Sequence, residues 1–403
     1  MREIAAIGVV GAGTMGSGIA QVAAEAGVEV LLFDPVDGAT ARARERVAGY
    51  LGRKVEKGQL SAEDASAGVE RIRPVSGLEG VAAADLVIEA VPEDLELKRD
   101  LFRDLDRIVA ADTILASNTS SLSIARISAA TTRPDRVLGL HFFNPVPLMA
   151  LVEVIPGPMT PWDLVDEVAL FARRLGKTPV VAADTPGFIV NRVQRALYLE
   201  AFRIFEEGLA EPAAIDDAMR QIGFRLGPFE LADVVGTDVN LAAGTAIFEG
   251  FYGDPRYRPA QVQRRVVDAG RLGRKTGAGY YDYDADGTRG DAWSALAHRP
   301  DGAPRLPAIK PPQIEARVLA AIVNEAASAV ADGVASPEAI DTAMRLASNW
   351  PDGPLAWGER IGLEPVVHTL DALHLAVPDG RYRVTPLLRA LSLNGGSFFA
   401  EPA

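Results

Sequence analysis

The stretch that decides the fold is residues 4–27, IAAIGVVGAGTMGSGIAQVAAEAG. An apolar run typical of a buried strand leads into the pattern G-x-G-x-x-G at Gly11, Gly13 and Gly16, and an alanine-rich segment typical of a helix follows. In this arrangement Gly11 allows a tight turn, Gly13 lets a phosphate approach the backbone, and Gly16 lets the helix pack closely on the strand. The pattern therefore predicts an α/β unit that binds a dinucleotide at the N-terminus of the helix.

The next strands extend this prediction. A second apolar run, residues 28–34, ends in Asp34, eighteen residues after Gly16. An acidic residue at this place accepts hydrogen bonds from the adenosine ribose and repels a 2′-phosphate, which favours NAD over NADP. Two more strands are predicted within residues 85–94 and 113–124, each ending in polar residues, where open α/β sheets bind ligands. We therefore expect a Rossmann-type NAD-binding domain over residues 1–184.

The composition narrows the classes of function. The chain has 403 residues, a formal net charge of −13 and 48% hydrophobic residues, so we expect an ordinary globular protein with neither nucleic-acid nor membrane partners. The absence of cysteine excludes disulfides, thiolate catalysis and cysteine-ligated metal, and it fits a reducing, cytoplasmic location. We predict no metal site. Imidazole chemistry is confined to four histidines: His141, His298, His368 and His374.

From Asp184 onward the pattern changes to long helical runs, and part of it occurs twice. Residues 200–236 match residues 325–362 at an offset of 125 that rises to 126, and the sequence RYR occurs at both 256–258 and 381–383. Two copies of one helical unit are therefore predicted to pack on each other. We expect the first copy at 185–283, a linker at 284–312 and a degenerate second copy at 313–403. The second copy is expected to lack the Asn-Arg pair of 191–192 and the RKTG turn of 274–277.

Several segments in this order resemble the L-3-hydroxyacyl-CoA dehydrogenase family, including the 3-hydroxybutyryl-CoA dehydrogenases. They are GAGTMG (11–16), LASNTSS (115–121), HFFNPVPLM (141–149), LVEVI (151–155), DTPGFIVNR (184–192), IDDAM (215–219) and GRKTGAGYYDY (273–283). The resemblance covers residues 1–283 once and the helical part again from about 314. It implies an NAD-dependent enzyme that oxidises an acyl-CoA thioester, (S)-3-hydroxyacyl-CoA, to 3-oxoacyl-CoA by hydride transfer.

His141 is the best candidate for the general base that this oxidation needs. It ends a predicted strand of the cofactor-binding sheet, whereas the other histidines lie in the linker or the second copy. Glu153 lies among aliphatic residues, and a carboxylate in such a place needs a partner such as imidazole. The resemblance implies that His141 and Glu153 form the catalytic pair. It also implies that Ser120 and Asn191 hold the oxygen of the substrate and position the imidazole.

The resemblance also assigns residues to both ends of the ligands. Glu93 and Lys98 match positions near the nicotinamide and its ribose, and Arg53 and Lys57 match positions that meet the CoA end of the substrate. The other predicted cofactor-binding residues belong to the glycine loop and to the strand ends. They are Gly11, Gly13, Thr14, Met15, Gly16, Asp34, Ala90, Val91 and Asn118.

Simpler interpretations stand beside these assignments. Ser120 can cap a helix, and Asn118 can form a turn. Arg53 and Lys57 can belong to a solvated helix face. Residues 273–283 are interpreted as a structural glycine turn, in which Arg274 and Lys275 could touch a substrate phosphate.

Two other functions stay open at this stage. One is a dehydrogenase of a free hydroxy acid such as gulonate, and the other is a non-catalytic NAD-binding relative of the lens-crystallin kind. A dicarboxylic acyl group such as hydroxyadipyl is also compatible with the sequence. Because one-copy relatives dimerise through the helical domain, we expect a monomer or a homodimer through the helical domains.

Overall fold

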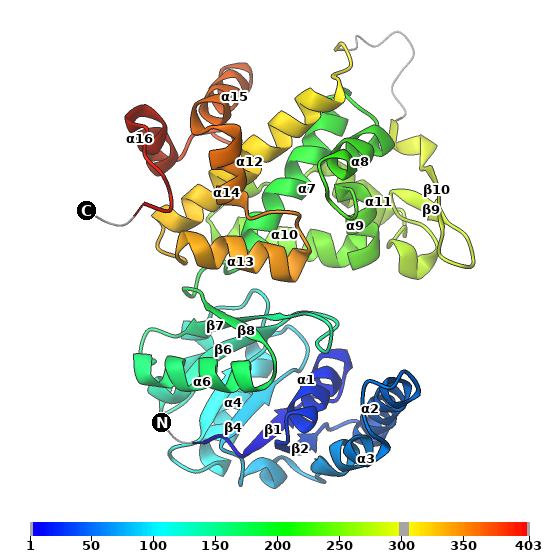
Figure 1. Cartoon of the computed structure of the whole chain (residues 1–403), viewed down its shortest axis with the longest axis vertical. Helices are drawn as coiled ribbons and strands as arrows, with labels where there is room; N and C mark the ends of the chain where they lie inside the picture. The colour runs from blue at the N-terminus through cyan, green and yellow to red at the C-terminus, as the bar shows by residue number, and fades with distance from the viewer. Residues whose placement is uncertain (1–2, 298–305, 401–403) are drawn as a thin grey trace. The chain divides into compact units, whose positions relative to one another are not determined.

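The computed structural model describes residues 3–297 and 306–400. They form two compact units, which meet in the chain between Phe188 and Ile189 (Figure 1). His298, within the predicted linker, lies outside the described residues.

The first unit is built on one sheet of eight strands in the order β3-β2-β1-β4-β5-β6-β7-β8. Strands β6 and β7 are antiparallel, and every other neighbouring pair in the sheet is parallel. The strands are β1 (Ala6–Val10), β2 (Glu29–Phe33), β3 (Ile72–Pro74), β4 (Leu86–Glu89), β5 (Ile114–Ser117), β6 (Val137–Phe142), β7 (Leu151–Pro156) and β8 (Thr178–Val181). Strand β1 pairs with both β2 and β4, so the strand order reverses there, which is where doubly wound sheets bind ligands. The predicted Rossmann-type fold is confirmed.

Helices cover both faces of this sheet, because its strands are apolar on both sides. In β4, Leu86 and Ile88 pack in one hydrophobic cluster and Val87 packs in the other. The first cluster lies under α1, α2 and α6, and the second lies under α4 and α5. The helices are α1 (Thr14–Glu25), α2 (Ala39–Glu56), α3 (Ala62–Arg71), α4 (Leu95–Ile108), α5 (Ile124–Ser128) and α6 (Trp162–Arg174).

The second unit holds both helical copies, and their long helices α7 and α12 lie side by side (Figure 1). The first copy comprises α7 (Val190–Glu206), α8 (Pro212–Gln221), α9 (Pro228–Val235), α10 (Thr237–Gly250) and α11 (Gln261–Asp268). The second copy comprises α12 (Pro311–Ala331), α13 (Pro337–Ser348), α14 (Pro354–Ile361), α15 (Leu363–Ala376) and α16 (Pro386–Asn394). The predicted repeat of one helical unit is therefore visible as five helices in each copy.

Buried ion pairs join the two copies, and each pair has its arginine in one copy and its carboxylate in the other. Arg192 of α7 donates from Nε to Glu325 of α12 at 2.7 Å, and Arg317 of α12 donates from Nε to Glu200 of α7. Each pair is the other shifted by the offset of 125 residues. As expected, the second copy lacks the Asn-Arg pair, but only the asparagine is replaced, by Ala316, and Arg317 takes the place of Arg192. The arginine is retained because each copy needs it to neutralise a carboxylate of the other.

The same exchange includes the tyrosines of the two RYR segments. The Tyr257 hydroxyl donates to Glu325 at 2.6 Å, and the Tyr382 hydroxyl donates to Glu200 at 3.1 Å. Each buried carboxylate therefore accepts hydrogen bonds from an arginine and a tyrosine of the other copy, which satisfies two of its lone pairs away from water.

Two boundaries differ from the expectation. Asp184, placed at the end of the first domain, accepts hydrogen bonds from the backbone of Ile124 (2.9 Å) and Ala125 (2.8 Å), so the chain stays with the first unit until Phe188. Part of the predicted linker, 284–312, also has regular secondary structure. Strand β10 (Arg289–Ala292) pairs with β9 (Tyr281–Tyr283) of the first copy.

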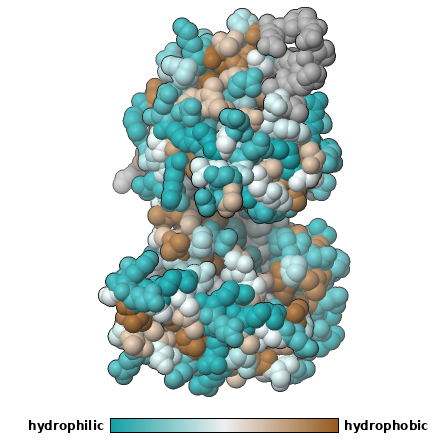
Figure 2. All heavy atoms as spheres, turned by 90° about the vertical axis from the view of Figure 1, so that its right-hand side faces the viewer, coloured by the Kyte–Doolittle hydropathy of each residue, from teal (hydrophilic) through white to brown (hydrophobic). Residues whose placement is uncertain are grey.

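On the face shown in Figure 2, hydrophilic side chains predominate and hydrophobic ones are scattered among them, as the 24% of charged residues leads one to expect. Within residues 3–297 and 306–400, no single helix is long and apolar enough to cross a membrane, and one bent pair, α9 with α10, meets the criterion by length and composition alone. The same residues contain no cluster of three or more His, Asp or Glu side chains suited to a metal ion.

Candidate active site

The glycine loop between β1 and α1 leaves a cradle of bare backbone. Gly11 has φ +103°, and a Cβ there would lie 2.6 Å from the oxygen of Ala90. A Cβ on Gly16 would lie 1.7 Å from the oxygen of Gly11, so this helix can pack on the loop only without a side chain. A Cβ on Gly13, in contrast, would meet nothing within 4 Å. The open side at Gly13, at the start of α1, fits the pyrophosphate of a dinucleotide.

Asp34 follows β2 and lies beside this loop. Its carboxylate accepts hydrogen bonds from the backbone nitrogens of Ala12 at 2.7 Å and Val36 at 2.9 Å. Arg46 of α2 reaches the same loop and donates to the oxygen of Ala12 at 2.8 Å and to the hydroxyl of Ser17 at 2.7 Å. The predicted ribose-binding carboxylate therefore lies at the edge of the cradle.

The other predicted loop and strand-end residues surround the cradle. Thr14 begins α1, and Met15 packs against the hydrophobic core of the first unit. Ala90 continues β4 by donating its backbone N–H to Val10 at 2.7 Å, and Val91 donates its own to the carboxylate of Glu89 at 2.7 Å. These backbone positions therefore hold the end of β4 next to the loop.

A buried charge cluster lies at the end of β4. Lys98 of α4 is 1% exposed and contacts Glu89 at 2.5 Å and Glu93 at 3.4 Å. Burial raises the pKa of Glu89, and Lys98 and Ser117 only partly offset it. Burial also acts to raise the pKa of Glu93, but the charge of Lys98 and the hydrogen bonds to this carboxylate outweigh it and lower that pKa. One ammonium thus holds two carboxylates at the predicted nicotinamide side of the sheet.

Glu93 also holds the polar loop that follows β5. One of its carboxylate oxygens accepts from the backbone and the hydroxyl of Ser120, at 2.8 and 3.1 Å, and from the hydroxyl of Thr119 at 2.7 Å. Ser120 is thereby fixed in a turn between Glu93 and the start of α5. Ser120 is not the helix cap that the simpler interpretation expects, because Ser123 caps α5 and accepts from the backbone of Arg126. The loop presents Ser120 at the carboxyl end of the sheet, where such sheets bind ligands.

His141 and Glu153 are direct cross-strand partners in the antiparallel pair β6–β7. Both side chains are buried, and Nδ1 of His141 lies 2.7 Å from a carboxylate oxygen of Glu153. The carboxylate can only accept, so Nδ1 carries the proton and Nε2 is the nitrogen available to act as a base. Antiparallel register thus explains why two residues twelve positions apart meet as predicted.

Two neighbours keep the imidazole in place. Its ring lies 4.4 Å from the ring of Phe143 and 6.0 Å from that of Phe188. The amide oxygen of Asn118, a predicted cofactor-binding residue, accepts from the backbone of Phe142 at 2.8 Å and so fastens the end of β5 to the strand that carries His141. Asn191, the remaining predicted catalytic residue, is the second residue of α7 and belongs to the second unit.

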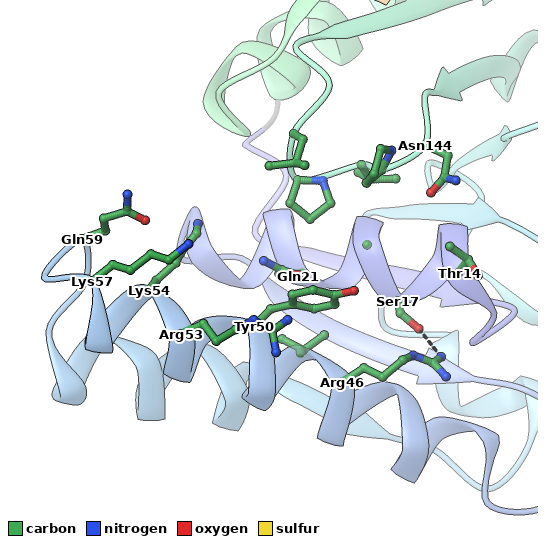
Figure 3. A pocket seen from close by; sticks show the side chains of 16 residues that line it. Thr14, Ser17, Gln21, Arg46, Tyr50, Arg53, Lys54, Lys57, Gln59 and Asn144 are labelled. Atoms are coloured by element: carbon green, nitrogen blue, oxygen red, sulfur yellow. Dashed lines mark hydrogen bonds between the residues drawn. The ribbon is translucent and has the colours of Figure 1, made fainter. Parts of the chain in front are cut away.

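A pocket of about 520 Å³ opens between α1, α2 and the loop that follows β6 (Figure 3). The predicted CoA-binding residues Arg53 and Lys57 both line it, and the guanidinium of Arg53 lies 4.5 Å from the ring centre of Tyr50. The sequence reasoning missed further lining residues: Gln21, Arg46, Tyr50, Lys54, Gln59 and Asn144. Those on α2 recur at helical spacing, a signal that would have found this positively charged face.

Residues 273–283 form a structural turn, as interpreted. A Cβ on Gly273 would lie 2.3 Å from the oxygen of Asp233, and the carboxylate of Asp233 accepts from the backbone of Tyr280 at 2.8 Å and Tyr281 at 3.0 Å. Lys275 pairs with Asp238 at 2.6 Å. The turn therefore fastens the end of the first copy onto α9 and α10.

Known proteins share both units of this chain. The NAD-binding domain of 3-hydroxyacyl-CoA dehydrogenase matches residues 6–185, and the C-terminal domain of that family matches residues 187–283 and 314–397. A 3-hydroxyadipyl-CoA dehydrogenase of Escherichia coli is 38% identical over 98% of both chains, and a probable 3-hydroxybutyryl-CoA dehydrogenase of Bacillus subtilis is 44% identical over 70% of this chain and 98% of its own. The crystal structure of a 3-hydroxybutyryl-CoA dehydrogenase from E. coli is similar over 98% of this chain and 99% of its own, with a TM-score of 0.89 and 38% identity. The chain thus belongs to the 3-hydroxyacyl-CoA dehydrogenase family of NAD-dependent oxidoreductases.

Proposed function

We propose that this enzyme oxidises (S)-3-hydroxyacyl-CoA to 3-oxoacyl-CoA with His141 as the general base. The observation that carries the proposal is the 2.7 Å contact between Nδ1 of His141 and Glu153, on a sheet whose glycine loop has the open backbone that NAD requires. Nε2 takes the proton of the C3 hydroxyl, and Glu153 stabilises the imidazolium that forms. NAD, held at the glycine loop and Asp34, would supply the acceptor for the hydride of the C3–H bond.

The remaining residues hold the reactants. We assign the substrate oxygen to Ser120 and Asn191, and the nicotinamide end of NAD to Glu93 and Lys98. The pocket beside α2 is suited to the phosphates of CoA, because four cationic side chains line it in a chain of net charge −13: Arg46, Arg53, Lys54 and Lys57. This positive pocket supports a CoA thioester over a free hydroxy acid, which has no phosphate for it to bind.

The test is the reverse reaction, followed as NADH oxidation at 340 nm with acetoacetyl-CoA. We expect turnover with the thioester and NADH, and little with free acetoacetate or with NADPH. Equal turnover of free acetoacetate would support the hydroxy-acid alternative. Binding of NADH without turnover of any thioester would support the non-catalytic alternative.

We also propose that the second helical copy takes the place of a partner subunit. The support is the exchange of the pairs Arg192–Glu325 and Arg317–Glu200, in which each copy completes the buried charges of the other. Light scattering is expected to give a mass near that of one chain, 42.7 kDa, at micromolar concentration. A stable assembly of several chains over the same concentrations would contradict this.

A further inference from the structure

One loop of the first unit both lines the pocket beside α2 and joins the two strands that carry the catalytic pair. Residues 143–150 connect β6 with β7, and His141 and Glu153 are cross-strand partners on either side of this loop. Five consecutive residues of the loop, 144–148, line the pocket. A displacement of the loop therefore changes the pocket and acts on the strand ends that hold His141 and Glu153.

The pocket extends from this loop along α1 and α2 (Figure 3). Thr14 and Asn144 lie at one end of it, and Lys57 and Gln59 lie at the other. Asn144 is three residues after His141, so the chain ties the first end of the pocket closely to the proposed base. A thioester whose phosphates lie among the cationic residues would therefore follow the loop toward His141.

Lys177, the residue before β8, holds this loop in place. It is 8% exposed, and its ammonium donates to the backbone oxygens of Val146 at 2.5 Å and Met149 at 2.8 Å. The next residue, Thr178, donates its backbone N–H to the oxygen of Ala150 at 2.7 Å. One ammonium thus fixes the loop at two points that are three residues apart.

Helix α1 touches the same loop. A Cβ on Gly18, which also lines the pocket, would lie 2.8 Å from Cβ of Val146, so the helix and the loop meet only because this side chain is absent. The ammonium of Lys177 also interacts with charges near the pocket. Burial lowers its pKa, the charge of Glu25 offsets this in part, and the charge of Lys54 lowers the pKa further.

We propose that Lys177 is a positioning residue through which binding of the CoA end of the substrate promotes catalysis at His141. This inference rests on the proposed function. Contacts of the CoA end with residues 144–148 orient the C3 oxygen at His141 only if the loop keeps its place, and binding energy used in this way appears in kcat. Without the ammonium, two backbone oxygens lose a donor, and the loop must move to regain partners.

The experiment compares acetoacetyl-CoA with acetoacetyl-pantetheine, which has the same reacting group but lacks the nucleotide end, in the NADH assay. The unaltered enzyme is expected to have a kcat at least about tenfold higher with the CoA thioester. Lys177→Met is expected to lower this ratio of the two kcat values by about tenfold, through a loss with the CoA thioester and little change with the pantetheine thioester. Lys177→Arg, which can donate to both oxygens, is expected to recover part of the ratio.

Two further variants test whether the effect acts through the loop. Gly18→Ala leaves Lys177 intact and pushes on the loop at Val146, so it is expected to lower the ratio in the same direction. Arg173→Met, at an exposed residue of α6 four positions before Lys177, is the matched control and should leave the ratio unchanged. NADH affinity, measured by fluorescence, should stay within a few-fold of that of the unaltered enzyme in each variant, which shows that the first unit is folded.

The outcomes separate this proposal from the proposed function. An equal loss of kcat with both thioesters in Lys177→Met, an unchanged ratio in that variant, or equal kcat with both thioesters in the unaltered enzyme overturns the proposal and leaves the proposed function intact. If Lys177→Met does not bind NADH, Lys177→Gln, whose amide can donate to one of the two oxygens, takes its place under the same criteria. Inactivity of the unaltered enzyme with acetoacetyl-CoA overturns the proposed function itself.

Discussion

Replacement of His141 by glutamine is expected to lower kcat for acetoacetyl-CoA reduction by about 10³- to 10⁴-fold. In that direction the imidazolium must deliver a proton to the oxygen at C3, and a glutamine amide cannot do so. The side-chain amide can still donate to Glu153, which is 0% exposed, so this variant avoids leaving a buried carboxylate without a donor at this position. Steady-state kinetics with saturating NADH measures the effect.

The control for this prediction separates chemistry from binding. Cofactor affinity, followed by NADH fluorescence, should stay within a few-fold of that of the unaltered enzyme, because the glycine loop and Asp34 lie on other strands. His368→Gln, at an exposed histidine of α15, should leave kcat unchanged. Retention of more than a tenth of kcat in His141→Gln would exclude His141 as the proton donor.

Replacement of Glu325 by glutamine is expected to lower the free energy of unfolding of the helical unit by about 3 kcal/mol. Arg192 is 0% exposed, and Glu325 is one of the two acids that pair with it. Because glutamine has nearly the same shape, the change removes one charge without opening a cavity. The guanidinium would then keep only Asp332, which lies at 2.5 Å and is half-exposed, as a counter-charge.

Tryptophan fluorescence during urea unfolding reports on this unit. Trp350 and Trp357 of the second copy are buried against Phe224 of the first, each with ring centres 5.5 Å apart, so they detect separation of the copies. Glu200→Gln, the symmetric replacement, should destabilise to a similar degree. Glu338→Gln, at an exposed residue, should cost less than about 1 kcal/mol. An effect of Glu325→Gln no larger than that of Glu338→Gln would show that the exchanged pairs do not hold the copies together.

The two units differ in how far the sequence predicted them. In the first unit the glycine loop, Asp34, Asn118 and Ser120 follow strands, and strand ends are readable from apolar runs that stop at polar residues. His141 and Glu153 were therefore assignable before their antiparallel register was known. In the second unit the duplication is visible in the sequence, but which helices pack against each other is not. Helical spacing shows which face of a helix is buried and not which helix covers it.

The sequence by itself determined the local features: the glycine loop and its acidic partner, the duplication, the scarcity of histidine, and the motifs that carry the family resemblance. Their physical basis is short range, since glycine conformations, strand alternation and helix spacing act within a few residues. Only the tertiary structure decided that Arg192 pairs with Glu325 and Arg317 with Glu200, each carboxylate belonging to the other copy. Whether a charge is paired depends on residues more than a hundred positions away, and no local pattern encodes that distance.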